Sequence, residues 1–313
     1  MSDVVIAIDV GGTMTKCALT TLTGAVRHEE RHPTGAEQGP DGVVEHILDI
    51  AAGLAATARA AGLTPSALGL AVPGIVDDRR GVASYSANLG WRDVPLRARA
   101  EQRLGLPVAL GHDVRAGGLA EAALGAGRGA EHLLFVPIGT GIAAAHVIAG
   151  QVLVGAHGAA LELGHVVVRP QGRRCGCGRR GCLESEASAA AVAIRYHEQT
   201  GQRATAAQVA DRARRGDPAA ALVWRETVDV LADGLLAAIT LCDPELIVIG
   251  GGLASAGDQL LTPLRSALDA RRTFEASPRL SPAALGDRAG CLGAALLAIA
   301  AAAGSTGASG VAP

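Results

Sequence analysis

Apolar runs of strand length recur along the chain and alternate with segments that have helical spacing. The first run, residues 4–10, is apolar except for Asp9 and rich in β-branched side chains, which predicts a buried strand. In residues 41–61 the apolar side chains return every three or four positions, which predicts a helix. Strands that alternate with helices in this way are typical of an α/β fold.

Further elements are expected along the whole chain. The expected strands lie at residues 17–20, 25–31, 68–72, 108–110, 133–138, 142–149, 152–154 and 246–249. The expected helices lie at residues 94–104, through much of 188–241, and at 255–270 and 288–302. The hairpin near residues 4–31 has a counterpart near residues 133–168, which indicates a duplicated unit.

The length of 313 residues is sufficient for two domains. We expect a small N-terminal α/β domain over residues 1–112, with a helix at about 288–303 packing back on it. A large α/β domain is expected over residues 113–287. Residues 304–313 are rich in Gly, Ser and Ala and are expected to form a mobile tail.

A glycine turn directly follows each of three expected strands, at Gly11-Gly12-Thr13, Gly139-Thr140-Gly141 and Gly250-Gly251-Gly252. Glycine lets backbone amides approach an anion closely, and a threonine adds a hydroxyl donor. A single turn of this kind is more often only a hairpin, and the P-loop pattern GxxxxGK[ST] is absent. Three such turns, spread over both halves of the chain, indicate a nucleotide held between two α/β domains.

Three of the six cysteines fall within eight residues, Cys175, Cys177 and Cys182, and His165 stands ten residues before the first. Three thiolates and one imidazole form a complete tetrahedral ligand set for zinc, and a closed set of this kind is structural. A disulfide framework fits poorly, because three cysteines cannot all pair with one another and such frameworks belong to small secreted chains. A reactive or redox cysteine cluster is the weaker alternative.

Composition excludes several function classes. The formal net charge of −2, without a basic block, gives no support for nucleic-acid binding. The first residues have neither a charged n-region nor a cleavage site, and the apolar runs are interrupted before they reach membrane-spanning length. We therefore expect a soluble cytoplasmic protein with reduced thiols and without a membrane or nucleic-acid partner.

One acidic residue has the position of a catalytic group. Asp113 follows the short strand at 108–110 and opens a helical segment, which is where α/β proteins place catalytic residues. A helix N-cap is the more ordinary role of an Asp at such a place, and the two roles are compatible.

Seven short segments together carry a resemblance to one protein family. They are Asp9-Val10-Gly11-Gly12-Thr13 with Lys16, Asn88-Leu89-Gly90-Trp91, Asp113, Gly139-Thr140-Gly141, Glu162-Leu163-Gly164-His165, the segment from Cys175 to Glu184, and Asp243-Pro244-Glu245 running into the third glycine turn. With these segments the chain resembles, over nearly its whole length, the ROK family of sugar kinases, and among them the bacterial glucokinases. The resemblance implies the two-domain, actin-like (ribonuclease H-like) sugar-kinase fold with a structural zinc loop.

The resemblance also implies an activity and a set of site residues. The activity is ATP-dependent phosphorylation of a hexose at its 6-hydroxyl, most simply glucose to glucose 6-phosphate, by a homodimer or higher homo-oligomer. Asp113 would be the base, and the sugar contacts would be Asn88, His112, Glu162, His165 and Glu184. The phosphates would contact Gly11, Gly12, Thr13, Lys16, Gly139, Thr140 and Gly141, while Gly250, Gly251 and Gly252 would line the adenosine pocket. Asp9 would orient Mg²⁺ through water, and His165 would bind Zn²⁺ through one nitrogen and the sugar through the other.

Two segments depart from the family pattern. Where the family commonly has Asn-Asp-Ala-Asn, this chain has His112-Asp113-Val114-Arg115, and the GTGxG turn ends in Ala143. Amino sugars and other hexoses therefore stay open as substrates, including N-acetylglucosamine, kanosamine, mannose and fructose, and polyphosphate stays open as donor. The rival of a different class is a sugar-sensing ROK repressor. Repressors carry a DNA-binding domain before the ATPase-like part, for which we expect no room ahead of the first strand.

Overall fold

The computed structural model describes residues 2–307. By its internal contacts the chain divides into two compact units. Unit 1 holds the chain up to Ala120, the segment Val154–Ala160 and the chain from Asp287 onward, and unit 2 holds Glu121–Leu153 and Leu161–Gly286. The expected division lay after residue 112, whereas unit 1 continues to Ala120. The reason is close packing inside unit 1, where a Cβ on Gly293 would overlap the backbone of Ala116.

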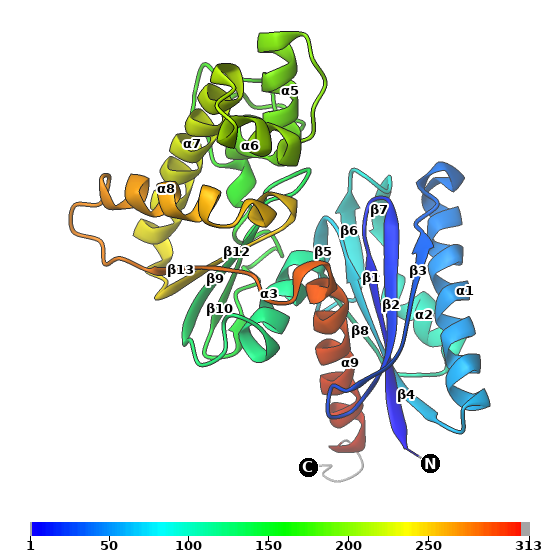
Figure 1. The fold of residues 1–313 in the computed structure, drawn as a ribbon. Helices are drawn as coiled ribbons and strands as arrows, with labels where there is room; N and C mark the ends of the chain where they lie inside the picture. Colours follow the sequence, from blue (N-terminus) through cyan, green and yellow to red (C-terminus); the bar gives the residue numbers. More distant parts are fainter. Residues whose placement is uncertain (1, 308–313) are drawn as a thin grey trace. The chain divides into compact units, whose positions relative to one another are not determined.

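A five-stranded sheet forms the centre of unit 1, in the order β3-β2-β1-β4-β8 (Figure 1). Its strands are β1 (Asp3–Val10), β2 (Met14–Thr21), β3 (Val26–Pro33), β4 (Thr64–Val72) and β8 (Val108–His112). The first three strands form an antiparallel meander, and β4 and β8 run parallel to β1. Asp9, near the end of β1, and Asp113, directly after β8, therefore stand at the same carboxyl edge of the sheet.

Unit 2 contains a second sheet with the same arrangement, in the order β11-β10-β9-β12-β13. Figure 1 labels β9, β10, β12 and β13 of this sheet. Its strands are β9 (His132–Pro137), β10 (Ala145–Ile148), β11 (Gln151–Val152), β12 (Leu246–Gly250) and β13 (Arg279–Pro282). Again the first three strands are antiparallel neighbours, and the last two run parallel to the first. The repeated strand order agrees with the duplication that the sequence indicated.

Helices cover both faces of the first sheet. α1 (Gly39–Ala60) packs Ile47 and Leu54 against the side of β1 that carries Ile6 and Ile8. α9 (Ala289–Gly307) packs small residues against the other side, so closely that a Cβ on Gly69 of β4 would overlap an α9 carbonyl. α2 (Leu96–Leu104) lies beside α1, and α3 (Asp113–Leu124) follows β8.

α9 is also apolar. Contrary to the expectation that every apolar run is too short, Gly286–Gly304 is, within residues 2–307, the one helical stretch that is long and apolar enough to cross a membrane. Ala294 and Ala298 of this helix are fully buried against the sheet of unit 1, as in the core helix of a globular domain. Length and composition alone therefore do not distinguish this helix from a core helix.

The helices of unit 2 surround a separate hydrophobic core. They are α4 (Leu183–Ala187), α5 (Ala189–Thr200), α6 (Ala206–Arg214), α7 (Pro218–Cys242) and α8 (Asp258–Asp269). Leu231 and Leu235 of α7 and Leu260 and Leu264 of α8 are buried in one cluster with Ile247 of β12. Short 3-10 turns complete the fold at η1 (Ala36–Gln38), η2 (Leu163–His165), η3 (Gly252–Ala256) and η4 (Gly286–Arg288).

A small antiparallel sheet in unit 1 was not expected from the sequence. It consists of β5 (Ile75–Asp77), β6 (Val82–Ser86) and β7 (Trp91–Val94). Trp91 opens β7 and is fully buried, and its Nε1 donates to the Pro40 carbonyl at 3.0 Å.

Several other boundaries also differ from expectation. The expected strand at 142–149 begins only at Ala145, because Ile142 makes an isolated bridge with Ile138, and the turn falls at residues 149–150 since Gln151 pairs with Ile148. The helix expected from residue 255 begins at 258, after η3. α9 continues to residue 307, into the expected tail, and residues 308–313 lie outside the described residues.

Candidate active site

The turn between β1 and β2 presents two backbone amides to solvent. The Gly11 amide donates to the Met14 carbonyl at 3.0 Å, and Thr34 donates through its hydroxyl and amide to the carbonyls of Gly11 and Thr13, at 2.7 and 2.9 Å. Within residues 2–307, the amides of Gly12 and Thr13 have no hydrogen-bond acceptor, and both residues are exposed. Consecutive amides that point outward in this way form a binding place for an anion.

Charged groups gather at the adjoining edge of the first sheet. The Asp9 carboxylate is 11% exposed, and Lys16 Nζ lies 3.7 Å from its Oδ2 and donates to the Asp287 carbonyl at 2.7 Å. Burial, and after it the negative charge of Asp113, raises the pKa of Asp9 to about 7. A carboxylate in such surroundings gains from a further positive charge, so this place fits a hydrated divalent cation.

The Asp113 carboxylate uses one oxygen for local contacts. Oδ1 accepts a hydrogen bond from the Val114 amide at 2.7 Å and lies 3.2 Å from His112 Nε2. Within the described part of the chain, no donor reaches Oδ2, and the carboxylate is 28% exposed. Asp113 can therefore cap α3 with one oxygen and accept a proton with the other.

Asn88 stands beside the first glycine turn. Its Nδ2 lies 4.0 Å from the position that a Cβ would take on Gly12, and the residue is exposed. Unit 1 thus gathers eight of the predicted site residues around one edge: Asp9, Gly11, Gly12, Thr13, Lys16, Asn88, His112 and Asp113.

In unit 2 a second glycine turn follows β9. The Gly139 amide donates to the Gly141 carbonyl at 2.9 Å, and the Ile142 amide donates to Glu184 Oε2 at 3.0 Å. Among residues 2–307, the amides of Thr140 and Gly141 have no acceptor. The arrangement matches the first turn, at the equivalent place in the second sheet.

The third glycine turn lies directly against the second. The Gly250 carbonyl accepts from the Ile138 amide at 2.9 Å, and the Ile138 carbonyl accepts from the Leu253 amide at 3.0 Å. Gly251 has φ +75° and no room for a Cβ beside the Ile138 backbone. A cavity of about 440 Å³ opens next to this turn, between η3, α6 and α7, and Gly252, Ala206 and Trp224 are among its lining residues.

The segment from His165 to Glu184, here called the cysteine loop, contains a tight hairpin. The Cys175 amide donates to the Arg179 carbonyl at 2.8 Å, and the Gly178 amide donates back to the Cys175 carbonyl at 3.0 Å. Gly181 has φ +68° and packs onto the Arg169 carbonyl, where a side chain would not fit. The glycines therefore bring the cysteines onto one side of the loop.

The four predicted ligands converge. His165 Nδ1 lies 3.6 Å from Cys175 Sγ, Cys177 Sγ lies 3.7 Å from Cys182 Sγ, and all four ligand atoms lie within 4.8 Å of one another. Zinc at tetrahedral angles, with Zn–S of about 2.3 Å and Zn–N of about 2.1 Å, separates two sulfurs by about 3.8 Å and a sulfur and nitrogen by about 3.6 Å. The donor set therefore fits zinc in both chemistry and spacing.

Glu162 and the second nitrogen of His165 lie at the start of the same loop. The His165 amide donates to the Glu162 carbonyl at 2.9 Å across η2. Because Nδ1 faces Cys175, Nε2 is the ring nitrogen that is left for another partner. Unit 2 thus gathers the second and third glycine turns, Glu184, Glu162 and the cysteine loop.

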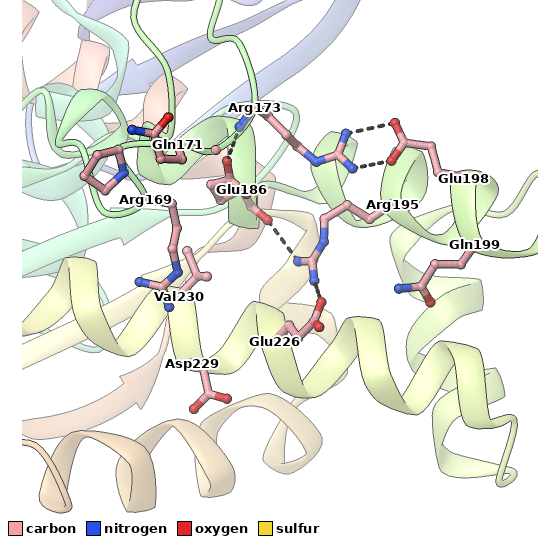
Figure 2. Close-up of a pocket in the computed structure, with 12 residues that line it drawn as sticks. Arg169, Gln171, Arg173, Glu186, Arg195, Glu198, Gln199, Glu226, Asp229 and Val230 are labelled. Carbon is pink, nitrogen blue, oxygen red and sulfur yellow. Dashed lines mark hydrogen bonds and ion pairs between the residues drawn. The ribbon is translucent and has the colours of Figure 1, made fainter.

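Ion pairs brace the cysteine loop on the helices of unit 2, around a cavity of about 700 Å³ (Figure 2). Arg173 pairs through both Nη atoms with Glu198 of α5, and its amide donates to Glu186 of α4 at 2.6 Å. Arg195 of α5, which is buried, donates to the Glu186 carbonyl at 3.1 Å and pairs with Glu226 of α7. The loop is therefore held directly by α4 and α5, and Arg195 connects these two helices to α7.

Two supporting residues were missed by sequence reasoning. Thr34 holds two carbonyls of the first glycine turn, 23 and 21 positions earlier in the chain. Arg115 is buried and pairs with Asp78, 37 positions earlier. The departure from the family's Asn at Arg115 was visible, but no local pattern connects either residue with its partner.

Comparison with known proteins extends these observations. The model of the family described as "ROK family" matches residues 5–301. The glucokinase of Thermotoga maritima is 34% identical over 279 residues, which cover 83% of this chain and 85% of that protein. The kanosamine kinase of Amycolatopsis mediterranei is 34% identical over 94% of this chain and 95% of that protein.

A solved structure has the same fold. It is a ROK family glucokinase from Streptomyces griseus in complex with glucose and AMPPNP, and it is 30% identical to this chain. The match covers 94% of this chain and 99% of that chain, with a TM-score of 0.81. The α/β sugar-kinase fold expected from the sequence is thereby confirmed.

Proposed function

This chain belongs to the ROK family, and from that premise we propose that it is an ATP-dependent sugar kinase that phosphorylates a hexose at the 6-hydroxyl, with glucose as the expected substrate. The observation that carries the proposal is the Asp113 carboxylate. One of its oxygens is unengaged within the described residues, at the sheet edge that also presents Asp9 and the outward amides of the first glycine turn.

In the proposed reaction Asp113 Oδ2 accepts the proton of the sugar's 6-hydroxyl as the hydroxyl oxygen bonds to the γ-phosphorus. The bond from that phosphorus to the β–γ bridging oxygen breaks, and ADP is the leaving group. The His112 and Val114 contacts hold Oδ1 and thereby fix the orientation of the carboxylate. Phosphoryl transfer depends chiefly on positioning and on neutralising phosphate charge, and a single aligned base is sufficient for the proton.

Backbone amides bind the phosphates in this proposal. The two glycine turns offer the amides of Gly12, Thr13, Thr140 and Gly141, and Lys16 adds a positive charge. Mg²⁺ bound with the nucleotide would neutralise phosphate charge, and Asp9 would hold its water ligands. The cavity beside Gly252 would receive the adenosine.

We further propose that the cysteine loop holds one structural zinc, whose chemistry there is to fix the loop. The loop would orient the sugar contacts of His165 and Glu184, which flank the three cysteines. Carboxylates suit a polyol, because charge-assisted hydrogen bonds to hydroxyls are stronger than neutral ones and depend on hydroxyl geometry.

The identity of the sugar is the finer part of the proposal. Relatives named glucokinase, kanosamine kinase and N-acetyl-D-glucosamine kinase are all similar to this chain, so the family alone does not select one hexose. Glucose is favoured because several relatives with 30–34% identity over most of the chain are named glucokinase. ATP is the proposed donor because the related structure binds AMPPNP.

A coupled assay tests the proposal directly. Purified protein is supplied with ATP or polyphosphate and each of glucose, mannose, fructose, kanosamine and N-acetylglucosamine, and the phosphorylated carbon is identified by NMR. Glucose 6-phosphate formed from ATP with the highest kcat/KM is the expected result. A different preferred sugar replaces the glucose assignment, and no turnover of any sugar contradicts the kinase proposal. Relatives named putative xylose repressor and xylose repressor make sugar binding without phosphorylation the outcome to examine in that event.

A further inference from the structure

A charged side chain lies in the interior of unit 1. Arg115 stands two residues after Asp113 on α3, and its side chain is 6% exposed. Burying a guanidinium is unfavourable unless its donors are paired, and leaving its partner unpaired is unfavourable as well. The partners of Arg115 therefore indicate which parts of the fold it holds together.

Arg115 joins three segments that are far apart in the sequence. Nη2 donates to Asp78 Oδ1 at 2.7 Å and to the Val76 carbonyl at 3.4 Å, and Nη1 donates to the Gly158 carbonyl at 2.9 Å. Val76 and Asp78 belong to β5 and the turn after it, while Gly158 belongs to the segment Val154–Ala160, here called the strap. One planar group thus connects the start of α3 with β5 and with the strap.

The strap is a short excursion of the chain. Its residues belong to unit 1, whereas Leu153 before it and Leu161 after it belong to unit 2. It packs on β5 without an intervening side chain, since Gly158 has φ +71° and a Cβ there would overlap the Val76 carbonyl. Leu161 then takes φ +62°, a costly conformation for leucine that marks where the chain leaves the strap.

Glu162 follows directly. It comes four residues after Gly158, so even a fully extended chain places it within about 14 Å of the carbonyl that Arg115 holds. A segment that is fixed before the ligand arrives loses less conformational entropy on binding.

We propose that Arg115 is a positioning residue for the sugar: by holding the strap on the unit that carries Asp113, it fixes the anchor from which Glu162 reaches the substrate. The inference rests on the proposed function, in which Asp113 is the base and Glu162 a sugar contact. Releasing the strap misplaces Glu162 and leaves the phosphate turns intact, so it affects the KM for sugar and spares the KM for ATP.

A purely structural role predicts something different. If Arg115 only neutralises the half-buried Asp78, then Arg115→Met harms the protein by leaving that carboxylate unpaired. The double variant Arg115→Met/Asp78→Asn removes both charges and repairs that defect, while the Gly158 carbonyl stays without its donor. The double variant therefore separates charge compensation from the hold on the strap.

The experiment compares wild type, Arg115→Met, the double variant, Arg115→Lys and the control Arg97→Met. Arg97 donates to the Asp78 and Arg79 carbonyls, in the same turn, and its hydrogen bonds do not reach the strap. Hydrogen exchange of residues 154–162 is measured without sugar, alongside the melting temperature and the KM values for sugar and ATP.

The expected result for the double variant is a melting temperature near that of wild type, faster exchange in the strap, and a sugar KM raised by roughly 10- to 100-fold with an unchanged KM for ATP. Arg115→Lys should fall between wild type and the double variant, because one ammonium cannot reproduce the fork of two Nη donors. Arg97→Met should leave the exchange of the strap and the sugar KM as in wild type.

Wild-type exchange in the strap of the double variant overturns the inference, and so does a wild-type sugar KM. Hydrogen exchange is measured without any substrate, so it shows whether Arg115 holds the strap even if the wild-type protein phosphorylates no sugar. A wild-type protein that phosphorylates no sugar contradicts the proposed function, and with it the role of the strap in sugar binding.

Discussion

Glu184 Oε2 accepts a hydrogen bond of 3.0 Å from the Ile142 amide, so one carboxylate joins the cysteine loop to the second glycine turn. A Cβ on Gly141 would collide with the same carboxylate. One side chain therefore connects the proposed sugar contact with the proposed phosphate turn. Substitutions of Glu184 that keep or remove its hydrogen bond to the Ile142 amide can measure the two contributions to substrate binding separately.

Glu184→Gln and Glu184→Ala should differ in kind. Glutamine keeps an oxygen for the Ile142 amide and loses only the charge, so we expect a sugar KM raised by about tenfold with an unchanged KM for ATP. Alanine also leaves the Ile142 amide without its acceptor and should raise both KM values. If alanine changes the sugar KM alone, the link from Glu184 to the turn has no role in nucleotide binding.

Asp113→Asn should fold normally and lose turnover. The asparagine oxygen can still accept from the Val114 amide, so the melting temperature should change by only a few degrees. Loss of the base lowers kcat by on the order of 10²–10⁴, and misplacement of the acceptor hydroxyl adds to that. Steady-state kinetics with circular dichroism provides the test, and near-normal kcat would reduce Asp113 to a helix cap.

The raised pKa of Asp9 predicts a pH dependence of stability. In the folded protein the carboxyl has a pKa of about 7 against 3.8 for an unperturbed group, so between these values the folded state holds the extra proton. Ionisation of Asp9 therefore lowers the free energy of unfolding as pH rises through this window, by on the order of 4 kcal/mol in total. The stabilising contribution of Asp9 is complete only below about pH 4.

Asp9→Asn should remove that contribution. Urea unfolding of wild type and Asp9→Asn at several pH values between 4 and 8 gives the difference between their free energies of unfolding. The contributions of the other carboxyl groups cancel in this difference. We expect the variant to gain relative stability with rising pH. Equal pH slopes for the two proteins would mean that Asp9 ionises normally.

Zinc content tests the cysteine loop. Protein purified without added metal should contain one zinc per chain, and Cys177→Ala should lower that content and raise the sugar KM. Cys242→Ala, at the end of α7 and outside the ligand set, is the matched control and should keep its zinc. Absence of zinc by elemental analysis, together with full activity in a strong chelator, would contradict the assignment.

His112 is the position most suited to a test of sugar selectivity. Its Nε2 faces the base at 3.2 Å from Asp113 Oδ1, where the family pattern has an asparagine. An imidazole cannot offer both the donor and the acceptor of an amide in the same place, and an unpaired sugar hydroxyl costs roughly 1–3 kcal/mol. His112→Asn should therefore change the ratio of kcat/KM between glucose and its 4-epimer or 2-amino analogues. Unchanged ratios at one fixed pH would make His112 a packing residue.

Short-range features of this protein were readable from the sequence. The glycine turns and the Cys175-Cys177-Cys182 cluster depend on residues a few positions apart, and their local conformation follows from glycine and from ligand chemistry. The helix over 41–61 and the strand over 4–10 have complete apolar patterns, and both were placed to within two residues.

Long-range features were not readable. β13, which pairs with β12, contains Arg279 and Pro282 and has no apolar run, so only its neighbour makes it a strand. β5 is three residues long, too short to show a period. The contact between Arg115 and Gly158 joins positions 43 apart, and the burial that creates it depends on the packed fold.

The crossings of the chain between the two units limit how the protein can be divided. The path changes unit four times, after Ala120, Leu153, Ala160 and Gly286, so neither unit is encoded by one contiguous stretch of gene. A fragment cut at any single position separates strands or helices that belong to one core. A chimera that takes unit 1 from another family member must exchange three segments together, and recombination at a single breakpoint would give two incomplete cores.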